Sequence, residues 1–407
     1  MAEQIWFHID VNSAFLSWTA VDEIAAGKNR DLRQMAAIIG GDISKRRGVV
    51  LAKSTIAKSY GIRTGEPITD ALKKCPDLVI VQPDHSRYEW YSQKLMNLLK
   101  TYSPKLYQYS IDECFLAYVV PEQGLSKNQI RKRAVLDAYH LKDRIKNELG
   151  FTVNIGISVN KLLAKMASDF KKPDRVHTLF PDEIQEKMWP LPVEDLFMVG
   201  RSSAERLKLL GIKTIGDLAK SNQDMLTAHL KSHGRVIWEY ANGIESTPLD
   251  ARSKTDHKGI GNSTTLSHDV TDRKEIEGIL KILAEKTGER LRETGQLSGM
   301  ICVEIKYYHF KSVSHQMQLL TPTDSSNMIF KAAQQLFDEL WNEDPVRLLG
   351  IRLSKLCSRE QQQMNLFDME NQEKMQKLDQ ALDQIRNKFG QDAVIRGSFV
   401  KSPGKKK

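Results

Sequence analysis

The chain has 407 residues, of which 41% are hydrophobic and 27% are charged, and its formal net charge is +9. A globular protein of this length is expected to divide into two to four domains, and its positive charge suits a polyanionic partner. The longest apolar runs, such as residues 36–39, are too short to cross a membrane, and residues 1–30 lack the layout of a signal peptide.

The N-terminal half alternates apolar runs with helical patterns, which favours an α/β fold. Residues 5–9 form an apolar run that ends on Asp10 and predict a buried strand, and residues 13–26 follow with helical spacing. Residues 44–74 carry eight basic and two acidic side chains, a local excess of +6 that favours a phosphate-rich partner.

Two neighbouring carboxylates stand at the tip of a predicted hairpin. Residues 106–118 predict two strands around a tight turn, with Asp112 and Glu113 at the turn. Residues 151–157 predict a further strand, and residues 160–169 predict a helix that ends before Pro173.

The C-terminal half predicts helices followed by a split sheet. Residues 190–243 have helical spacing with glycine-containing turns, and residues 246–260 are polar and aperiodic, as in a linker. The segment 259–355 predicts the order β-α-β-β-α-β, in which helices cover one face of a sheet. Its six elements are expected at 259–266, 276–291, 300–308, 312–320, 328–340 and 346–355.

Asp10, Asp112 and Glu113 together predict a metal site. Adjacent strand residues face opposite ways, so two neighbouring carboxylates serve one site only where the chain turns. The apolar flanks place that turn on a buried sheet, where crowded carboxylates need a hard cation such as Mg²⁺. Val11 would add a backbone carbonyl, and two ions held there would support phosphoryl transfer. The plainer alternative is a solvated acidic turn.

Three segments of the chain form an ordered set of motifs. They read HIDVNSAF at residues 8–15, SIDE at residues 110–113 and GISVNKLLAKMASD at residues 156–169. Together they resemble the palm motifs of Y-family DNA polymerases of the DinB/UmuC type, and the resemblance continues in order along essentially the whole chain. It implies a template-directed DNA polymerase of low fidelity that performs translesion synthesis on primer-template DNA with two Mg²⁺ ions.

The resemblance also implies an architecture. We expect an α/β multidomain, right-hand polymerase with an α+β palm, small fingers, a helix-hairpin-helix thumb and a βαββαβ little finger. The expected bounds are 1–20 and 80–172 for the palm, 21–79 for the fingers, 173–245 for the thumb, 246–258 for a linker, 259–355 for the little finger and 356–407 for the tail.

The resemblance assigns roles to the palm motifs. Asp10, Asp112 and Glu113 match the family's metal ligands, and the same three residues match its catalytic residues. Phe15 matches the aromatic steric gate that clashes with a ribose 2′-OH, although an aromatic residue at this spacing is more often part of a core. Ser13 and Ala14 are expected beside the incoming nucleotide.

Three further positions are expected to meet the deoxynucleoside triphosphate. Lys161 matches a lysine that contacts the triphosphate. Thr55 and Lys58 stand where the family usually has a tyrosine and a phosphate-binding arginine. A lysine neutralises phosphate as a point charge without the bidentate geometry of arginine. The alternative for both lysines is a surface charge that keeps the protein soluble.

Two regions are expected to bind the DNA backbone. Residues 196–207 followed by 210–218 resemble a helix-hairpin-helix, whose turn at Gly200, Ser202 and Ser203 would direct N–H groups at a phosphate, with Met198 in place of the usual first glycine. The uncovered face of the predicted split sheet would present Lys306, Tyr308 and Arg352. Ordinary helix packing and a merely solvated face are the alternatives.

The tail contains a short segment, Gln363-Met364-Asn365-Leu366-Phe367, that resembles the peptide by which bacterial polymerases bind the sliding clamp. In a polar setting, Leu366 and Phe367 would be two apolar anchors for a groove, with Gln363 as the first residue of the motif. One amphipathic helix and a basic end follow.

Two other function classes remain open from the sequence. One is a catalytically silent protein that binds DNA and the clamp on the same scaffold, and the other is a metal-dependent nuclease. The scattered cysteines and the absence of histidine spacing for zinc favour a reduced cytoplasmic protein without structural zinc, and the resemblance implies association with the nucleoid. We expect a monomer without membrane contact.

Overall fold

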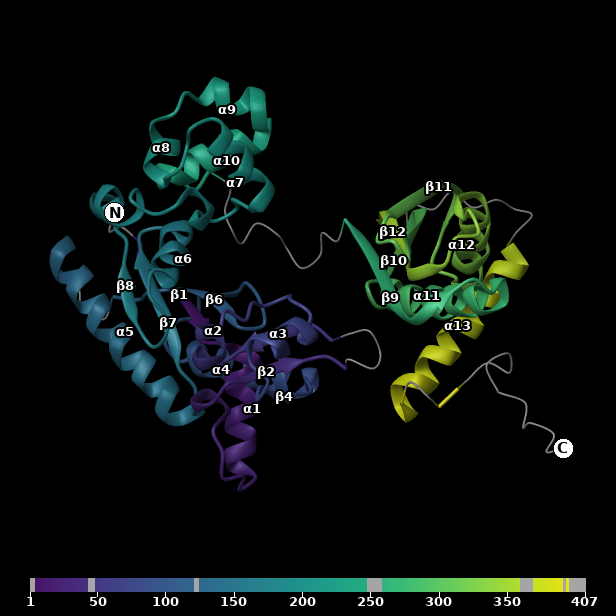
Figure 1. The fold of residues 1–407 in the computed structure, drawn as a ribbon, viewed down its shortest axis with the longest axis horizontal. Coiled ribbons are helices and arrows are strands. Elements are labelled where there is room, and N and C mark those ends of the chain that lie inside the picture. The colour runs from purple at the N-terminus through teal and green to yellow at the C-terminus, as the bar shows by residue number, and fades with distance from the viewer. Residues whose placement is uncertain are drawn as a thin grey trace. The chain divides into compact units, whose positions relative to one another are not determined.

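The structure, a computed structural model, describes residues 4–42, 48–120, 124–246, 258–358, 369–390 and 393–394, with residues 369–376 described by their backbone only. These residues form two compact units, the first ending at Ser246 and the second beginning at Lys258 (Figure 1). Gln363, Leu366 and Phe367 of the expected clamp peptide, and most of the expected linker, lie outside the described residues.

The first unit is built on a five-stranded sheet with the order β5-β6-β1-β7-β8. The central strand β1 is antiparallel to both neighbours, and β7 runs parallel to β8. The strands span Trp6–Val11 (β1), Leu106–Gln108 (β5), Glu113–Ala117 (β6), Val153–Ser158 (β7) and Val176–Thr178 (β8). The hairpin predicted around Asp112 is therefore confirmed, with β5 and β6 as its arms.

Helices cover both faces of this sheet. They span Ala14–Ala25 (α1), His85–Lys100 (α4), Lys127–Leu149 (α5) and Lys161–Asp169 (α6). Phe7, Ile9 and Val11 share one buried core with side chains of α4 and α5. His8 and Asp10 alternate with them and face α6, because successive strand residues point to opposite sides.

A second, smaller sheet with the order β3-β2-β4 has a core of its own. Its elements are Ala37–Gly40 (β2), Val50–Lys53 (β3), Thr55–Ser59 (α2), Ile68–Lys74 (α3) and Val79–Val81 (β4). All but β4 fall within 21–79, the range expected for the fingers, and β4 begins at the end of that range and continues past it. Ser54 begins α2 by accepting a 2.9 Å hydrogen bond from the backbone N–H of Ala57.

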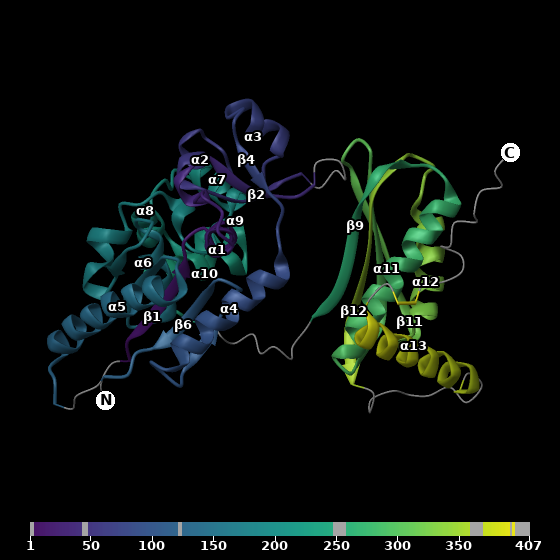
Figure 2. The same cartoon turned by 90° about the horizontal axis from the view of Figure 1, so that it is seen from below.

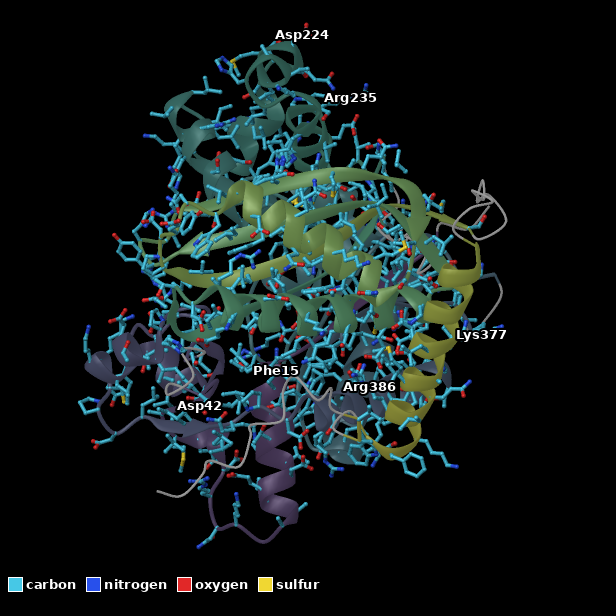
Figure 3. All side chains as sticks on the ribbon, turned by 90° about the vertical axis from the view of Figure 1, so that its right-hand side faces the viewer. Phe15, Asp42, Asp224, Arg235, Lys377 and Arg386 are labelled. Carbon is cyan, nitrogen blue, oxygen red and sulfur yellow. The ribbon has the colours of Figure 1, made fainter. Side chains whose placement is uncertain are left out.

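Short helices complete the first unit around a third buried cluster. They span Arg201–Leu209 (α7), Ile215–Lys220 (α8), Gln223–Leu230 (α9) and Ser232–Ala241 (α10), and Figure 3 labels Asp224 on α9 and Arg235 on α10. Single 3-10 or π turns occupy Leu32–Gln34, Pro181–Glu183, Ile184–Met188 and Val193–Asp195. The first unit is not divided further, so the separate bounds of palm, fingers and thumb stay predictions.

The second unit has the predicted order β-α-β-β-α-β, which confirms the split sheet. Its strands are all antiparallel, in the order β11-β10-β12-β9, and Figure 2 shows α11 and α12 on one face. The elements span Gly259–Val270 (β9), Arg273–Glu293 (α11), Gln296–Tyr307 (β10), Ser312–Thr323 (β11), Ser326–Leu340 (α12) and Val346–Ser358 (β12).

The predicted strands of this unit are wrong at several ends: β9, β11 and β12 run three or four residues further than predicted, and β10 begins four residues earlier and ends one residue earlier. Tyr308 was expected on the strand 300–308, but β10 ends at Tyr307 and Tyr308 begins the turn to β11. The turn contains Phe310 at φ 67, a left-handed conformation that ends regular strand geometry. Tyr308 therefore belongs to the turn, where its side chain is half exposed.

The tail contains the expected amphipathic helix, α13, over Met369–Phe389. Figure 3 shows Lys377 and Arg386 along it. Within the described part of the chain, no helix combines the length and the apolar character that a membrane span requires.

Candidate active site

The three predicted carboxylates lie at the ends of neighbouring strands. Asp10, on β1, stands directly opposite Glu113, the first residue of β6, and Asp112 is the last residue of the preceding turn. The backbone N–H of Val11 donates a 3.1 Å hydrogen bond to the carbonyl of Asp112. The sheet register therefore brings together residues that are about 100 positions apart in the sequence.

The turn itself is held by Ser110. Its hydroxyl donates a 2.7 Å hydrogen bond to the Asp112 carboxylate and accepts one of 3.1 Å from the backbone N–H of Glu113. This short-range network keeps Asp112 on the turn, while the Glu113 side chain points to the face of the sheet that Asp10 occupies.

Two lysines neutralise the opposed carboxylates. The ammonium of Lys172 lies 3.1 Å from Asp10 Oδ2 and 2.8 Å from Asp169 Oδ1. The ammonium of Lys165, on α6, pairs with Glu113 Oε2. Like charges directly opposite each other on a sheet are unfavourable, so the two cations offset a repulsion that the fold creates.

His8 contacts Glu113 on the face of the sheet that α6 covers. Its ring is fully buried, with Nε2 3.1 Å from Glu113 Oε2 and Nδ1 2.8 Å from Ser168 Oγ. Burial lowers the pKa of His8, which keeps the ring neutral. Because an ionised carboxylate can only accept, the Nε2–H of His8 is the donor.

The two opposed carboxylates have different proton affinities. Burial is the main cause that raises the pKa of Asp10 to about 6, against the opposing effect of Lys172. Burial would also raise the pKa of Glu113, but the His8 hydrogen bond and the Lys165 charge together lower it to about 2. Of these two, Asp10 is therefore the carboxylate whose negative charge its surroundings stabilise less.

The donor set suits a hard divalent cation in its chemistry. Asp10 and Glu113 offer oxygen ligands at one sheet edge, and the raised pKa of Asp10 shows a carboxylate that its surroundings stabilise poorly. Among the residues that the structure describes, no three His, Cys, Asp or Glu side chains converge closely enough to hold one ion. The metal site with Asp10, Val11, Asp112 and Glu113 as ligands therefore stays a prediction.

Lys161 lies apart from the carboxylates. Its ammonium is 4.1 Å from the ring centre of Tyr107 and 4.5 Å from that of Trp6, at the start of β1 rather than at its Asp10 end. Lys165, one helical turn later, is the lysine of α6 that reaches Glu113. The Lys161 ammonium therefore lies at the opposite end of β1 from Asp10, and its role stays a prediction.

Phe15 occupies the first turn of α1, where Figure 3 labels it. Its half-buried ring stacks on that of Tyr88 at 4.3 Å and 8°, and His85 meets it edge-on at 5.9 Å. Ser13, directly before α1, is exposed, whereas Ala14 is buried. Of the three, Phe15 and Ser13 offer surface to a ligand.

The two expected nucleotide contacts of the smaller sheet lie on α2. Thr55 and Lys58 are both exposed on this helix, one turn apart. Their exposure is compatible with a phosphate contact and equally with a solvated surface, so their role stays a prediction.

The expected hairpin turn leads into α7. Met198 adopts φ 74, the left-handed conformation that the usual glycine would supply, and Gly200 directly precedes the helix. Gly200 and Ser202 are exposed and Ser203 is half-buried. The N–H groups at this end of α7 are therefore accessible to an anion.

The uncovered face of the second unit's sheet contains a shallow groove of about 440 Å³, lined by small and polar residues. Arg352 on β12 is exposed there and stands opposite Cys302 on β10. Lys306, four residues after Cys302 on the same face of β10, is half-buried. The lining residues include Gly261, Asn262, Ser263, Glu304, Ser314 and Arg352.

The sequence reasoning missed His8, Lys165, Asp169 and Lys172 as members of the site. His8 could have been found by strand alternation, because it stands two residues before Asp10 and so shares its face. Lys165 and Lys172 carry no comparable signal, since which lysine meets which carboxylate depends on how α6 packs against the sheet.

Comparisons with known proteins agree along the whole chain. The model of the impB/mucB/samB family matches residues 9–169, that of its C-terminal domain matches 257–366, and the IMS family HHH motif matches 181–212. A DNA polymerase IV of Clostridium acetobutylicum is 46% identical over 99% of this chain and 100% of its own length, and one of Bacillus velezensis is 34% identical over 98% and 94%. A solved Y-family DNA polymerase chimera shares the fold, with a TM-score of 0.72 and 23% identity over 87% of this chain and all of its own.

Proposed function

The chain belongs to the impB/mucB/samB family of Y-family DNA polymerases, and from that premise we propose that Asp10, Asp112 and Glu113 hold two Mg²⁺ ions for nucleotidyl transfer to a primer 3′-OH. It is a DNA-directed DNA polymerase of the low-fidelity, translesion class. The family's metal dependence is general, whereas the identity and number of the ions are part of the proposal.

One observation carries the assignment of the site. Asp10 and Glu113 oppose each other across adjacent strands, and each is paired with an ammonium group. Two carboxylates that need external cations at a sheet edge are a natural site for divalent ions. The chemistry that such ions supply when bound is activation of the attacking oxygen and neutralisation of the leaving phosphate.

The surrounding residues orient the carboxylates. The Nε2–H of His8 fixes the Glu113 side chain, and Ser110 fixes the turn that carries Asp112. A buried donor of this kind narrows the positions that a carboxylate can adopt, and so reduces the reorganisation needed when a ligand binds.

A lysine is also proposed to bind the incoming triphosphate. Lys161 is proposed in this role, and its ammonium lies near the rings of Trp6 and Tyr107 at the start of β1. Thr55 and Lys58 are proposed as contacts from the fingers, through their exposed positions on α2.

Phe15 is proposed as the steric gate. Its ring is held flat against Tyr88, so it cannot easily move away from a bulky sugar substituent. Ser13 and Ala14 precede it and would line the same nucleotide site. In single-nucleotide assays, Phe15→Ala is expected to raise ribonucleotide incorporation relative to deoxynucleotide, and unchanged sugar discrimination would refute the assignment.

The DNA backbone is proposed to meet two surfaces. The first is the N-terminal end of α7 with Gly200, Ser202 and Ser203, which lies within the matched IMS family HHH motif at residues 181–212. The second is the open sheet face with Lys306 and Arg352, to which Tyr308 would add a contact from its turn.

The remaining partners are proposals from the tail sequence and the family. We propose that residues 363–367 bind the sliding clamp through Leu366 and Phe367, and that the protein acts as a monomer in the cytoplasm at the nucleoid. Binding of a 356–370 peptide to the clamp, abolished by alanine at Leu366 and Phe367, tests the first of these.

Primer extension separates this function from its alternatives. With Mg²⁺ and the four deoxynucleotides, the wild-type chain is expected to extend a primer on its template, and the Asp112→Ala/Glu113→Ala variant is expected to bind the same DNA without extending it. Degradation of the primer by the wild type would favour a nuclease. Equal lack of extension by both proteins would favour a catalytically silent binding protein.

A further inference from the structure

The candidate active site contains two lysines whose ammonium groups contact its carboxylates. They are Lys165 and Lys172, which we call the lysine pair. Each ammonium contacts one of the opposed carboxylates, Lys165 at Glu113 and Lys172 at Asp10. The side chain of Lys165 is 11% exposed and that of Lys172 is 35% exposed, so neither is a freely solvated surface charge. The pair matches the number of carboxylates that face each other across β1 and β6.

The position of Lys165 follows from a close approach of helix and strand. Gly156 lies on β7, and a Cβ atom there would be 1.9 Å from the carbonyl oxygen of Ala164 and 2.5 Å from the backbone nitrogen of Ser168. Only a glycine allows α6 to lie this close to the sheet. Lys165 lies between those two helix positions, and the close approach brings its side chain to Glu113.

Each member of the pair already contacts a second acceptor. The ammonium of Lys172 is 2.8 Å from Asp169, whose side chain is 52% exposed and lies outside the opposed carboxylates. The ammonium of Lys165 is 5.1 Å from the ring centre of Tyr109 and 5.4 Å from that of Phe197, within the range of cation–π attraction. Either lysine can release its carboxylate without becoming an isolated buried charge.

The chemistry of lysine favours such an exchange. An ammonium is a compact point charge on a flexible stem, and it does not form the two-point fork by which arginine grips a carboxylate. Three rotatable N–H donors allow it to change partners with a small movement. A pair meant only to lock the sheet would gain more from arginine.

We propose that the lysine pair neutralises Asp10 and Glu113 while no divalent cation is bound, and that both lysines move to their second acceptors when one is. This inference rests on the proposed role of the carboxylates as metal ligands. It makes Lys165 and Lys172 positioning residues that act through the carboxylates: they keep the metal-free palm folded and compete with the divalent cation for the same oxygens.

Competition with the metal ion predicts opposite effects on protein stability and on metal affinity, which a purely structural residue would not show. A lysine ammonium that must leave its carboxylate before a metal ion binds lowers the affinity for that ion. The bound ion weakens the lysine–carboxylate pair by the same free energy, because the coupling is reciprocal. Removal of Lys165 is therefore expected to destabilise the metal-free protein and at the same time to tighten the binding of divalent cations. Replacement of a residue that only supports the fold would lower the stability of the protein by the same amount with and without metal.

The test compares Lys165→Gln and Lys172→Gln with the wild type in the full-length chain. Thermal unfolding is followed in EDTA and through a magnesium chloride series, and Mn²⁺ binding is measured by the loss of the free Mn²⁺ signal in electron paramagnetic resonance. Both variants are expected to unfold at lower temperature in EDTA, to recover most of the difference in Mg²⁺, and to bind Mn²⁺ on the order of tenfold more tightly.

Lys187→Gln is the matched control. The Lys187 side chain is 35% exposed, like that of Lys172, and it pairs with Glu183 at 2.5 Å in the same unit, away from the carboxylate edge. The control is expected to leave Mn²⁺ affinity unchanged. Equal or weaker Mn²⁺ binding by both lysine-pair variants, or an equal loss of stability with and without Mg²⁺, would overturn the inference.

The same experiment separates failure of the inference from failure of the proposed metal site. Wild-type binding of Mn²⁺ that Asp10→Asn and Glu113→Gln abolish supports the metal site, whatever the lysine variants do. If the wild type binds Mn²⁺ no better than these two carboxylate variants, the metal site itself is wrong and the exchange falls with it. If Lys165→Gln does not fold, Lys172→Gln carries the same comparison.

Discussion

The two units bury ion pairs of different kinds. In the first unit, lysine ammonium groups pair with Asp10 and Glu113, the carboxylates of the proposed metal site. In the second, Arg292 on α11 grips Asp383 of α13 through two N–H groups, at 2.6 and 3.0 Å. The lysines are point charges that can change partners, whereas the arginine forms a two-point fork suited to a permanent joint.

The contrast extends to what each pair holds. Arg292 also lies 3.7 Å from Asp379, which accepts a 2.9 Å hydrogen bond from the N–H of Ser326 at the start of α12. Arg386 of α13 pairs with Glu285 of α11 at 2.8 Å. The arginines thus hold α11, α12 and α13 together, while the lysines contact carboxylates of the proposed metal site.

The largest effect is expected from closing the space at Gly156. A Cβ there would force α6 away from β7 and with it Lys165 from Glu113, so Gly156→Ala should destabilise the first unit by more than about 4 kcal/mol. Chemical denaturation monitors the loss. Gly299→Ala in β10 is the control, since its Cβ would meet nothing nearer than 3.5 Å. A stable Gly156→Ala protein would show that the close approach of α6 is not required.

The next effect concerns the arginine joint. Arg292→Ala leaves Asp379 and Asp383 buried without their cation, and it should release α13 at a cost of about 3 kcal/mol. Hydrogen exchange along α13 measures the release. Arg292→Lys is expected to retain only part of the docking, because it loses the second N–H contact. Full protection in the lysine variant would break the distinction drawn between the two cations.

The reverse substitution, from lysine to arginine, tests the comparison in the first unit. Lys165→Arg should hold Glu113 more firmly than lysine does, so metal-free stability is kept while Mn²⁺ binding weakens roughly fivefold. Unfolding in EDTA and Mn²⁺ titration give the two readouts. Tighter Mn²⁺ binding by the arginine variant would contradict the argument that fork geometry resists exchange.

The smallest effect is expected on the open sheet face of the second unit. Arg352 is exposed and Glu304 lines the same groove, so any contact with DNA there is spread over several weak hydrogen bonds. Arg352→Ala should lower DNA affinity alike for all sequences and reduce the slope of log affinity against log salt by about one. Fluorescence anisotropy at several salt concentrations measures it, and Ser314→Ala serves as an uncharged control. An unchanged slope would mean that this face does not meet phosphates.

Much of the architecture followed from local patterns. The split sheet was predicted because its helices repeat apolar residues every three or four positions, and Ile276, Leu280 and Leu283 are indeed buried. The carboxylate turn was predicted because Asp112 and Glu113 interrupt two apolar strands. The end of β10 was misplaced by a residue because a left-handed Phe310, which no apolar period reveals, begins the turn.

The partners of charged side chains could not be predicted in the same way. Lys161 and Lys165 are one helical turn apart on α6, yet one lies against Trp6 and Tyr107 and the other against Glu113. Their local sequence carries no difference that decides between these outcomes. The rotation and depth of α6 on the sheet decide it, and the absent side chain of Gly156 sets that depth.

The sequence by itself determined the order of elements in residues 259–355, the hairpin at residues 106–118 and the ordered motifs, because periodicity and residue type act over a few positions. Only the tertiary structure decided that Asp10 opposes Glu113, that His8 donates to Glu113 and that lysines neutralise both carboxylates. These contacts join residues 52 to 162 positions apart. Electrostatic interactions depend on distance in space and on burial, and neither quantity is written in the local sequence.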